Sequence, residues 1–188
     1  TMRLVERYAD RVTHSVSEPD DGLYHAMNKG IDLASGDLML FLNADDAFVH
    51  PTSLQTAIRA IQQAPADAGL YCGGVVWANP DQGWARPRRV DRISRTSMYR
   101  GSLPHQAMFI RRDVFDRVGM YDTSYEVVAD YEWCLRAMLR HGVAFEPIDV
   151  LLAVFMNGGV SDGDRHGKRM RAEYDRARRA FSSISVAV

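Results

Sequence analysis

Residues 37–46 read Asp-Leu-Met-Leu-Phe-Leu-Asn-Ala-Asp-Asp, a short continuous apolar run that ends in two adjacent carboxylates. An uninterrupted apolar run of this length is typical of a strand that is buried on both faces of a sheet. Open α/β sheets bind their ligands beyond the carboxyl ends of such strands. The sequence therefore predicts that Asp45 and Asp46 lie at the ligand-binding edge of a sheet.

The segments around this run alternate between helical and strand patterns. Apolar residues recur at helical spacing in some segments and form short continuous runs in others, and this alternation predicts an α/β fold with a mixed, mostly parallel sheet flanked by helices. Helices are expected over 23–34, 54–61, 111–118, 128–139 and 164–181, and strands over 37–43, 69–78, 105–110, 143–147 and 150–155.

The composition limits the function classes. With 188 residues, 46% of them hydrophobic, the chain can bury one sizeable core. A net charge of −1 provides no global positive field for nucleic acid. The two cysteines lie far apart without metal-ligand spacing, and no apolar run approaches the ~20 residues that span a bilayer. We therefore expect a cytoplasmic protein without a disulfide framework, and no nucleic-acid partner.

Three polar positions are candidates for chemistry, and each has a structural alternative. The pair Asp45 and Asp46 suits a divalent cation with substrate phosphates, but such a pair also caps helices. Asp130, near the start of a predicted helix, could be a general base or a residue that the helix dipole favours. His105 could be a base, a phosphate contact or a buried hydrogen-bonding residue. Spacing alone leaves these alternatives open.

Five blocks become specific in combination. The first block has three parts: Ser-Glu-Pro-Asp-Asp-Gly-Leu-Tyr-His-Ala-Met-Asn-Lys-Gly-Ile at 17–31, Ala-Ser-Gly-Asp-Leu at 34–38 and Phe-Leu-Asn-Ala-Asp-Asp at 41–46. The other four are Leu-Pro-His-Gln-Ala-Met-Phe-Ile-Arg-Arg at 103–112, Val-Gly-Met-Tyr-Asp at 118–122, Ala-Asp-Tyr-Glu-Trp-Cys-Leu-Arg at 129–136 and Gly-Gly-Val-Ser at 158–161. In this order they resemble the family 2 glycosyltransferases, which have the Rossmann-like GT-A fold.

The resemblance assigns a role to each block. It implies that Asp45 and Asp46 form the DXD-type element, which binds the donor ribose and a divalent Mn²⁺ or Mg²⁺ ion on the diphosphate, with Asp46 as the chief metal ligand. It implies that Asp130 is the catalytic base. The remaining residues that it places around the donor are His105, Gln106, Arg136, Gly158, Gly159 and Ser161.

The chain also departs from the family pattern. Asn43 stands where members often carry an aspartate, and the two N-terminal strands whose loops bind the nucleotide are not recognisable. The resemblance therefore implies an N-terminally truncated GT-A domain over 1–163, followed by a basic helix or tail over 164–188. We expect such a chain to self-associate and to transfer sugar poorly.

The predicted reaction is metal-assisted transfer of a sugar from a nucleotide-diphosphate sugar to a hydroxyl acceptor, with inversion. The resemblance places the acceptor among glycolipids, polysaccharides and related glycans. Contact of residues 164–181 with the inner face of the cell membrane is a further expectation. The alternative is a catalytically impaired nucleotide-sugar-binding or scaffold domain. A nucleotidyltransferase is disfavoured because no Gly-rich basic phosphate loop is present near the N-terminus.

Overall fold

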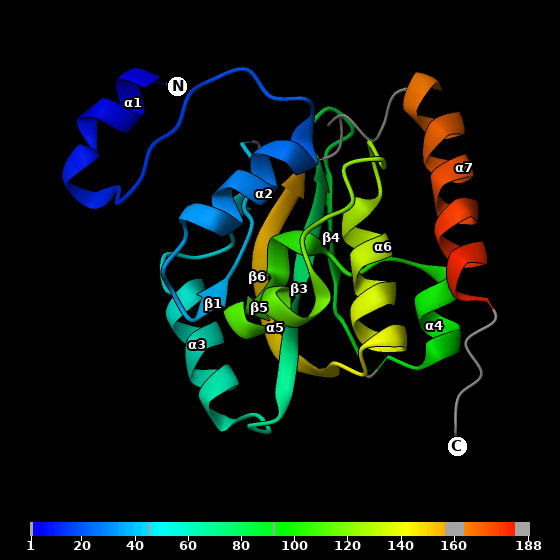
Figure 1. The fold of residues 1–188 in the computed structure, drawn as a ribbon. Helices are drawn as coiled ribbons and strands as arrows, with labels where there is room; N and C mark the ends of the chain where they lie inside the picture. Colours follow the sequence, from blue (N-terminus) through cyan, green and yellow to red (C-terminus); the bar gives the residue numbers. More distant parts are fainter. Residues whose placement is uncertain (1, 45, 92, 157–163, 183–188) are drawn as a thin grey trace.

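The computed structural model describes residues 2–44, 46–91, 93–156 and 164–182. Figure 1 shows a central sheet with helices packed around it, and α1 (Met2–Arg7) apart from the rest at the end of an extended segment. No residue of α1 is buried. The architecture is the mixed α/β sheet that the alternating sequence pattern predicts.

The sheet is built around two long strands that run parallel to each other, β3 (Ala68–Asn79) and β6 (Ala144–Met156). Across the sheet the strands follow the order β1 (Leu38–Met39), β5 (Met108–Arg111), β3, β6 and β2 (Ala47–Phe48). A further strand, β4 (Trp84–Arg88), also pairs with β3. These other pairings are antiparallel. The sheet is thus mixed as expected, but the described strands are more antiparallel than the sequence pattern suggested.

Glycines in β3 allow the neighbouring strands β4 and β6 to approach it closely. A β-carbon on Gly73 would lie 2.6 Å from the carbonyl oxygen of Val150 in β6, and one on Gly74 would lie 2.6 Å from the carbonyl oxygen of Arg88 in β4. Both separations are shorter than a β-carbon tolerates, so no larger side chain fits without movement. The β3–β6 register shifts at the same place, and β6 remains one strand where we expected two.

Helices cover the sheet. In Figure 1, α2 (Leu23–Leu33), α5 (Arg112–Val118) and α6 (Ala129–Leu135) lie in front of it, and α7 (Asp164–Phe181) runs beside α6. The other helical segments are α3 (Ser53–Gln63), which contacts β6, α4 (Arg95–Arg100), and the short turns η1 (Ala9–Arg11), η2 (His105–Ala107) and η3 (Arg136–Arg140). None of the helices in the described ranges is long and apolar enough to cross a membrane.

Aromatic side chains join α2, α5 and α6 into one core. The rings of Phe115 and Trp133 lie 4.8 Å apart, and the ring of Tyr121 lies within 6 Å of both as well as of Tyr24 and Phe41. Ala177 and Phe181 of α7 are buried in the same core. The basic helix that we expected to follow the domain therefore shares the core of the domain.

Two local expectations differ from the structure. The strand expected over 37–43 is limited to Leu38–Met39 and lies at an edge of the described sheet. The strand expected over 105–110 begins only at Met108, because the preceding residues form the 3-10 turn η2. That turn, which bears His105, contacts both β3 and β6.

Candidate active site

Asp130 lies in the first turn of α6, with its side chain 16% exposed. One carboxylate oxygen, Oδ1, accepts a hydrogen bond from the hydroxyl of Tyr24 at 2.8 Å. The other, Oδ2, lies 3.5 Å from Nδ1 of His105. The carboxylate is thus held from both sides by residues distant in the sequence, and part of it remains open to solvent.

His105 connects Asp130 to the segment that follows β1. On the far side of the imidazole, Nε2 lies 2.9 Å from the side-chain amide nitrogen of Asn43. When this amide donates to Nε2, the ring proton is on Nδ1 and faces Asp130. The position where the family often carries an aspartate therefore contacts the partner of the candidate base.

Asp46 belongs to the same cluster. Its backbone N–H donates to the carbonyl oxygen of Asn43 at 3.1 Å, and its Oδ2 accepts from the backbone N–H of Asn43 at 3.4 Å. This turn directly precedes β2, which pairs with the end of β6. Asp46 therefore sits at the edge where β6 ends, and its negative charge acts on His105.

The two members of the His105–Asp130 pair stabilise each other's charged forms. Burial opposes ionisation of Asp130, but hydrogen bonding and charge from His105, with the Tyr24 hydroxyl and the Tyr131 backbone N–H, outweigh it and lower the pKa of Asp130. Burial likewise disfavours the imidazolium, but Asp130 and the charge of Asp46 raise the pKa of His105 above its ordinary value. Asp130 is consequently a carboxylate at neutral pH.

The other predicted site residues that the structure describes are Gln106 and Arg136. Gln106 is buried, with 3% of its surface exposed. The guanidinium of Arg136 donates to Glu132 and to the carbonyl oxygens of Val118 and Met120, at 2.7–3.1 Å. Arg136 thus forms hydrogen bonds within the protein that bind α6 to the turn after α5. Asp45, Gly158, Gly159 and Ser161 lie outside the described residues.

Comparison with known proteins identifies the family. The model of "Glycosyl transferase family 2" matches residues 1–120. The chain belongs to this family. The matched part of the glycosyltransferase includes Asp46 and His105, whereas Asp130 lies beyond it.

Curated relatives carry the same class of name. The chain is 31% identical over 147 residues to the PGL/p-HBAD biosynthesis glycosyltransferase Rv2957 of Mycobacterium tuberculosis, which covers 77% of this chain and 55% of that protein. It is 34% identical over 148 residues to the uncharacterized glycosyltransferase Rv1514c of the same organism, covering 77% of this chain and 54% of that protein. The chain thus spans about half the length of these family members.

Solved structures show the fold of the family 2 domain. Staphylococcus aureus TarS 1–349 in complex with UDP-GlcNAc aligns with a TM-score of 0.63 at 15% identity, over 96% of this chain and 58% of that one. A second structure of TarS 1–349 aligns with a TM-score of 0.60 at 16% identity, over 97% of this chain and 59% of that one. The GT-A-type fold expected from the sequence is therefore confirmed.

Two residues of the cluster were missed as site residues by sequence reasoning. Tyr24 belongs to the apolar stripe of α2 with Met27 and Ile31, and a buried tyrosine requires a partner for its hydroxyl. That requirement was the available signal, but the identity of the partner depends on tertiary contacts. In the sequence, Asn43 is only a departure from the family pattern, whereas in the structure its side chain contacts His105.

The donor set of the site fits a divalent metal that is shared with a substrate. Within the described ranges no three His, Cys, Asp or Glu side chains group as a metal site. Asp46 nevertheless offers a hard oxygen ligand at the end of a strand pair. Mg²⁺ and similar ions are commonly held by one or two carboxylates together with substrate phosphates and water. Asp46 would therefore hold such an ion only together with ligands from a substrate phosphate and water.

Proposed function

We propose that the site transfers a sugar from a nucleotide-diphosphate sugar to a hydroxyl acceptor, with inversion at the anomeric carbon. The observation that carries the proposal is the partly exposed carboxylate of Asp130, which His105 and Tyr24 keep ionised next to the turn that bears Asp46. The TarS complex with UDP-GlcNAc supports a nucleotide-sugar donor for this fold. The names of the curated relatives support transfer over the binding-only alternative.

Asp130 is proposed to be the general base. A carboxylate has about four lone-pair sites, and Tyr24, His105 and the backbone N–H of Tyr131 occupy three of them in the structure. The remaining site can accept the proton of the acceptor hydroxyl while its oxygen attacks the anomeric carbon. The bond from that carbon to the diphosphate oxygen breaks in the same step. A single displacement of this kind inverts the configuration.

His105 is proposed to support the base. Its raised pKa favours the imidazolium, and the positive charge keeps Asp130 ionised before the reaction. When Asp130 takes up the proton, the contact weakens because one member of the pair is then neutral. The Asn43 side chain contacts the ring on its other side and so limits where Nδ1 can point: its nitrogen donates to Nε2 of the neutral ring, and the amide must turn to offer its oxygen to the N–H of the imidazolium.

Asp46, together with Asp45, is proposed to hold a Mn²⁺ or Mg²⁺ ion against the donor diphosphate. When bound, such an ion stabilises the negative charge that develops on the leaving nucleoside diphosphate. The loop residues Gly158, Gly159 and Ser161 are proposed to contact the same diphosphate, and Gln106 to support the sugar side of the cleft from the buried turn η2. For Arg136 we propose support of the α6 fold behind the site.

The sheet edge formed by β1 bears on whether the protein associates with a second copy of itself. Within the described residues β1 has one neighbouring strand, and Leu33 and Leu42 beside it are 40% and 39% exposed. Edge strands with exposed apolar residues favour pairing with another chain, so we propose self-association there. Sedimentation velocity of the wild type and of Leu42→Lys tests this. A concentration-independent monomer in the wild type contradicts it.

The substitution Asp130→Asn tests the reaction in the full-length protein. Asparagine is nearly isosteric but cannot take up the proton, so we expect turnover to fall by about 10²–10⁴-fold while donor affinity is retained. Nucleoside diphosphate release from a panel of UDP-, GDP- and dTDP-sugars measures turnover, calorimetry measures affinity, and NMR of the product shows its anomeric configuration. Asp113→Asn, an exposed residue paired with Arg111, is the control. Unchanged turnover in Asp130→Asn, or retention of configuration, contradicts the proposal.

A further inference from the structure

A buried carboxylate on α7 binds the chain just ahead of the candidate base. Glu173 is 9% exposed. It accepts three backbone hydrogen bonds, from the N–H groups of Glu126 at 2.9 Å, Val127 at 2.9 Å and Val128 at 3.2 Å. A carboxylate loses its bound water when it is buried, and here the three backbone N–H groups replace the hydrogen bonds from that water. Residues 126–128 thereby take a fixed path into α6.

The same turn is held from the opposite side by the residue that contacts Asp130. The hydroxyl of Tyr24 lies 2.8 Å from the carbonyl oxygen of Val127 and 2.8 Å from Oδ1 of Asp130. The peptide units around Val127 are thus bound at their N–H groups by Glu173, and the Val127 carbonyl oxygen shares the single hydroxyl proton of Tyr24 with Oδ1 of Asp130. Movement of this turn would displace the hydroxyl and the carboxylate together.

The start of α6 lacks a local alternative to Glu173. The first backbone N–H groups of a helix have no partner within the helix, and Ser, Thr, Asn or Asp side chains at the N-cap usually bind them. The N-cap residue of α6 is Val128, and no side-chain cap hydrogen bond is present there. Glu173, on a helix more than forty residues further along the chain, instead accepts from the N–H groups of Val127 and of the N-cap residue Val128, which lie just before the first turn. Its negative charge also suits the positive end of the helix dipole.

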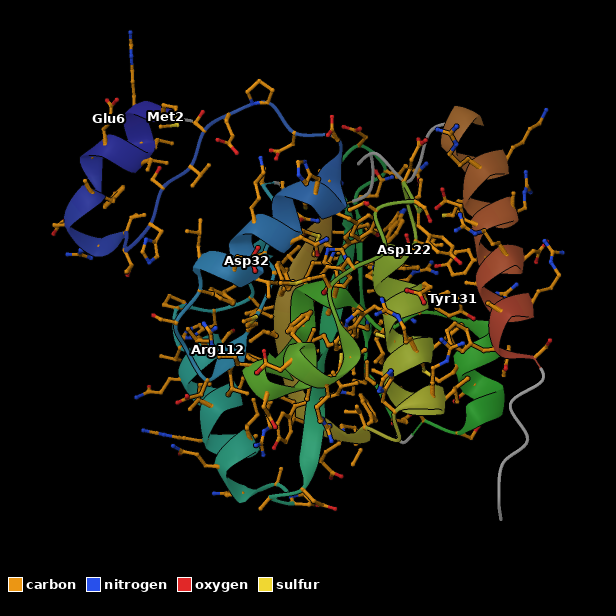
Figure 2. The ribbon with its side chains drawn as sticks, viewed as in Figure 1. Met2, Glu6, Asp32, Arg112, Asp122 and Tyr131 are labelled. Atoms are coloured by element: carbon orange, nitrogen blue, oxygen red, sulfur yellow. The ribbon has the colours of Figure 1, made fainter. Side chains whose placement is uncertain are left out.

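Packing of α7 against α6 holds Glu173 in place. Ala177 and Phe181, on the same helix, are 0% and 2% exposed. The rings of Tyr131 and Tyr174 lie 4.7 Å apart, and Figure 2 shows Tyr131 on the side of α6 that faces α7. The hydroxyl of Tyr99 donates to the carbonyl oxygen of Phe181 at 2.8 Å. The position of the Glu173 carboxylate is therefore set by the docking of a whole helix.

We propose that Glu173 is a positioning residue for Asp130. It fixes the turn at 126–128 and, through Val127 and Tyr24, the direction in which the Asp130 carboxylate points. The inference rests on the proposed function, in which Asp130 is the base. It makes α7, which lies beyond the residues that the family model matches, a required part of the active site.

Kinetics of Glu173 variants in the full-length protein test the proposal. Glu173→Gln replaces one acceptor oxygen with an NH₂ group that only donates, so it cannot bind all three N–H groups. We expect kcat to fall about tenfold or more, because small misplacements of a catalytic group cost up to about 10²-fold, while KM for the nucleotide sugar changes less than about twofold. Glu173→Asp, which keeps the carboxylate, should recover part of kcat. Nucleoside diphosphate release from the same panel of nucleotide sugars measures both constants.

Two control variants separate positioning from stability. Phe181→Leu weakens the docking of α7 without removing the carboxylate, and Arg169→Gln removes the exposed ion pair between α7 and Glu126. Arg169→Gln should retain kcat, whereas Phe181→Leu should lower kcat less than Glu173→Gln does at the same melting temperature. A folded Glu173→Gln protein with unchanged kcat overturns the proposal. So does a loss of kcat in Phe181→Leu that equals the loss in Glu173→Gln at the same melting temperature.

A measurement without turnover distinguishes this proposal from the proposed function. The pKa of Asp130 can be followed by carbon-13 NMR of its carboxyl group. If the turn at 126–128 moves in Glu173→Gln, the Tyr24 hydrogen bond to Asp130 is lost, and the pKa of Asp130 should rise. An unchanged pKa overturns the positioning role, even if Asp130→Asn abolishes turnover. Full turnover in Asp130→Asn with a raised pKa in Glu173→Gln contradicts only the role of Asp130 as base.

Discussion

Two acidic residues of α6 lie two positions apart and are used differently. Asp130 pairs with His105, an ionisable partner, and its side chain is 16% exposed. Glu132 pairs with Arg136 on the next turn at 3.0 Å, and its side chain is 9% exposed. Arg136 also donates to the carbonyl oxygens of Val118 and Met120, so all three of its side-chain nitrogens are engaged by protein groups.

The difference shows what separates a structural ion pair from a chemical one. Arginine keeps its charge at all working pH values, and its five N–H donors suit a fixed network. Histidine changes charge near neutral pH, and a partner carboxylate can then gain and lose a proton in response. Of the two pairs, the one that contains His105 combines an ionisable cation with the more exposed carboxylate, and it is the pair that we propose to act in catalysis.

The largest expected effect is on stability, from Arg136→Leu. Removing one member of a buried ion pair leaves the other charge without its partner, which typically costs about 3–5 kcal/mol. We expect the free energy of unfolding in urea to fall by about 3 kcal/mol at the lower end of that range, because Glu132 and two carbonyl oxygens lose their donor. Arg140→Leu on the same turn is the control. If kcat of the folded Arg136→Leu protein is lost while stability is kept, the structural reading of this pair is wrong.

The next effect concerns the carboxylate on the other side of His105. In Asp46→Asn we expect the Mn²⁺-dependent part of the affinity for a UDP-sugar to fall about tenfold or more, since even residues that only support metal ligands cost about 10–100-fold when changed. Calorimetry with Mn²⁺ and with EDTA measures this part. Asp149→Asn, an exposed residue paired with Arg89, should behave as the wild type. Equal affinities with and without Mn²⁺ in the wild type would refute the metal role.

The pH dependence of turnover tests whether the His105–Asp130 pair acts in catalysis. A lowered pKa of Asp130 means that the base stays ionised until the pH falls below its ordinary value of 3.8. The acid limb of the kcat/KM profile should therefore lie below pH 3.8, to the extent that the protein remains folded. Since hydrogen bonding and charge from His105 help to lower this pKa, His105→Gln should move the acid limb to higher pH.

Two controls complete the pH experiment. Glutamine cannot carry charge, so the alkaline change in activity that reports deprotonation of His105 should also disappear in His105→Gln. The variant His141→Gln, changed at an exposed position, should keep the wild-type profile. An acid limb at the same pH in the wild type and in His105→Gln would show that the pair is not coupled in catalysis.

The smallest expected effect is at the outer surface of α7. Arg169, Arg176 and Arg178 are already engaged by Glu126, Asp122 and Asp175. We propose that the remaining exposed cations, including Lys168 and Arg171, contact anionic membrane, where each contributes about 1 kcal/mol at most. Co-sedimentation with vesicles of anionic and of neutral lipid, at low and high salt, measures this. Arg171→Gln should lower binding to anionic vesicles only, and equal binding to both lipids contradicts the proposal.

The sequence alone determined the fold class, the family and the order of the site blocks. The apolar run before Asp46 and the helical pattern after Ala129 are local periodicities, and short-range periodicity reports which face of an element is buried. The same patterns predicted a strand over 69–78, which the structure has as Ala68–Asn79, and a helix over 164–181, which it has as Asp164–Phe181. The resemblance of ordered blocks then provided what periodicity cannot, namely expected roles for Asp130 and His105.

Only the tertiary structure decided which residues meet. Tyr24 and Asp130 are 106 positions apart, and Asn43 and His105 are 62 apart, so no local pattern links them. Tertiary contacts also decided the partners of Arg136, which donates to the carbonyl oxygens of Val118 and Met120 on a neighbouring turn as well as to Glu132. The basic segment at 164–181 looked like an appendage because its charges dominate its composition. Its buried minority, Glu173, Ala177 and Phe181, docks it on α6, since packing depends on the few residues that lose contact with water and not on the average of the segment.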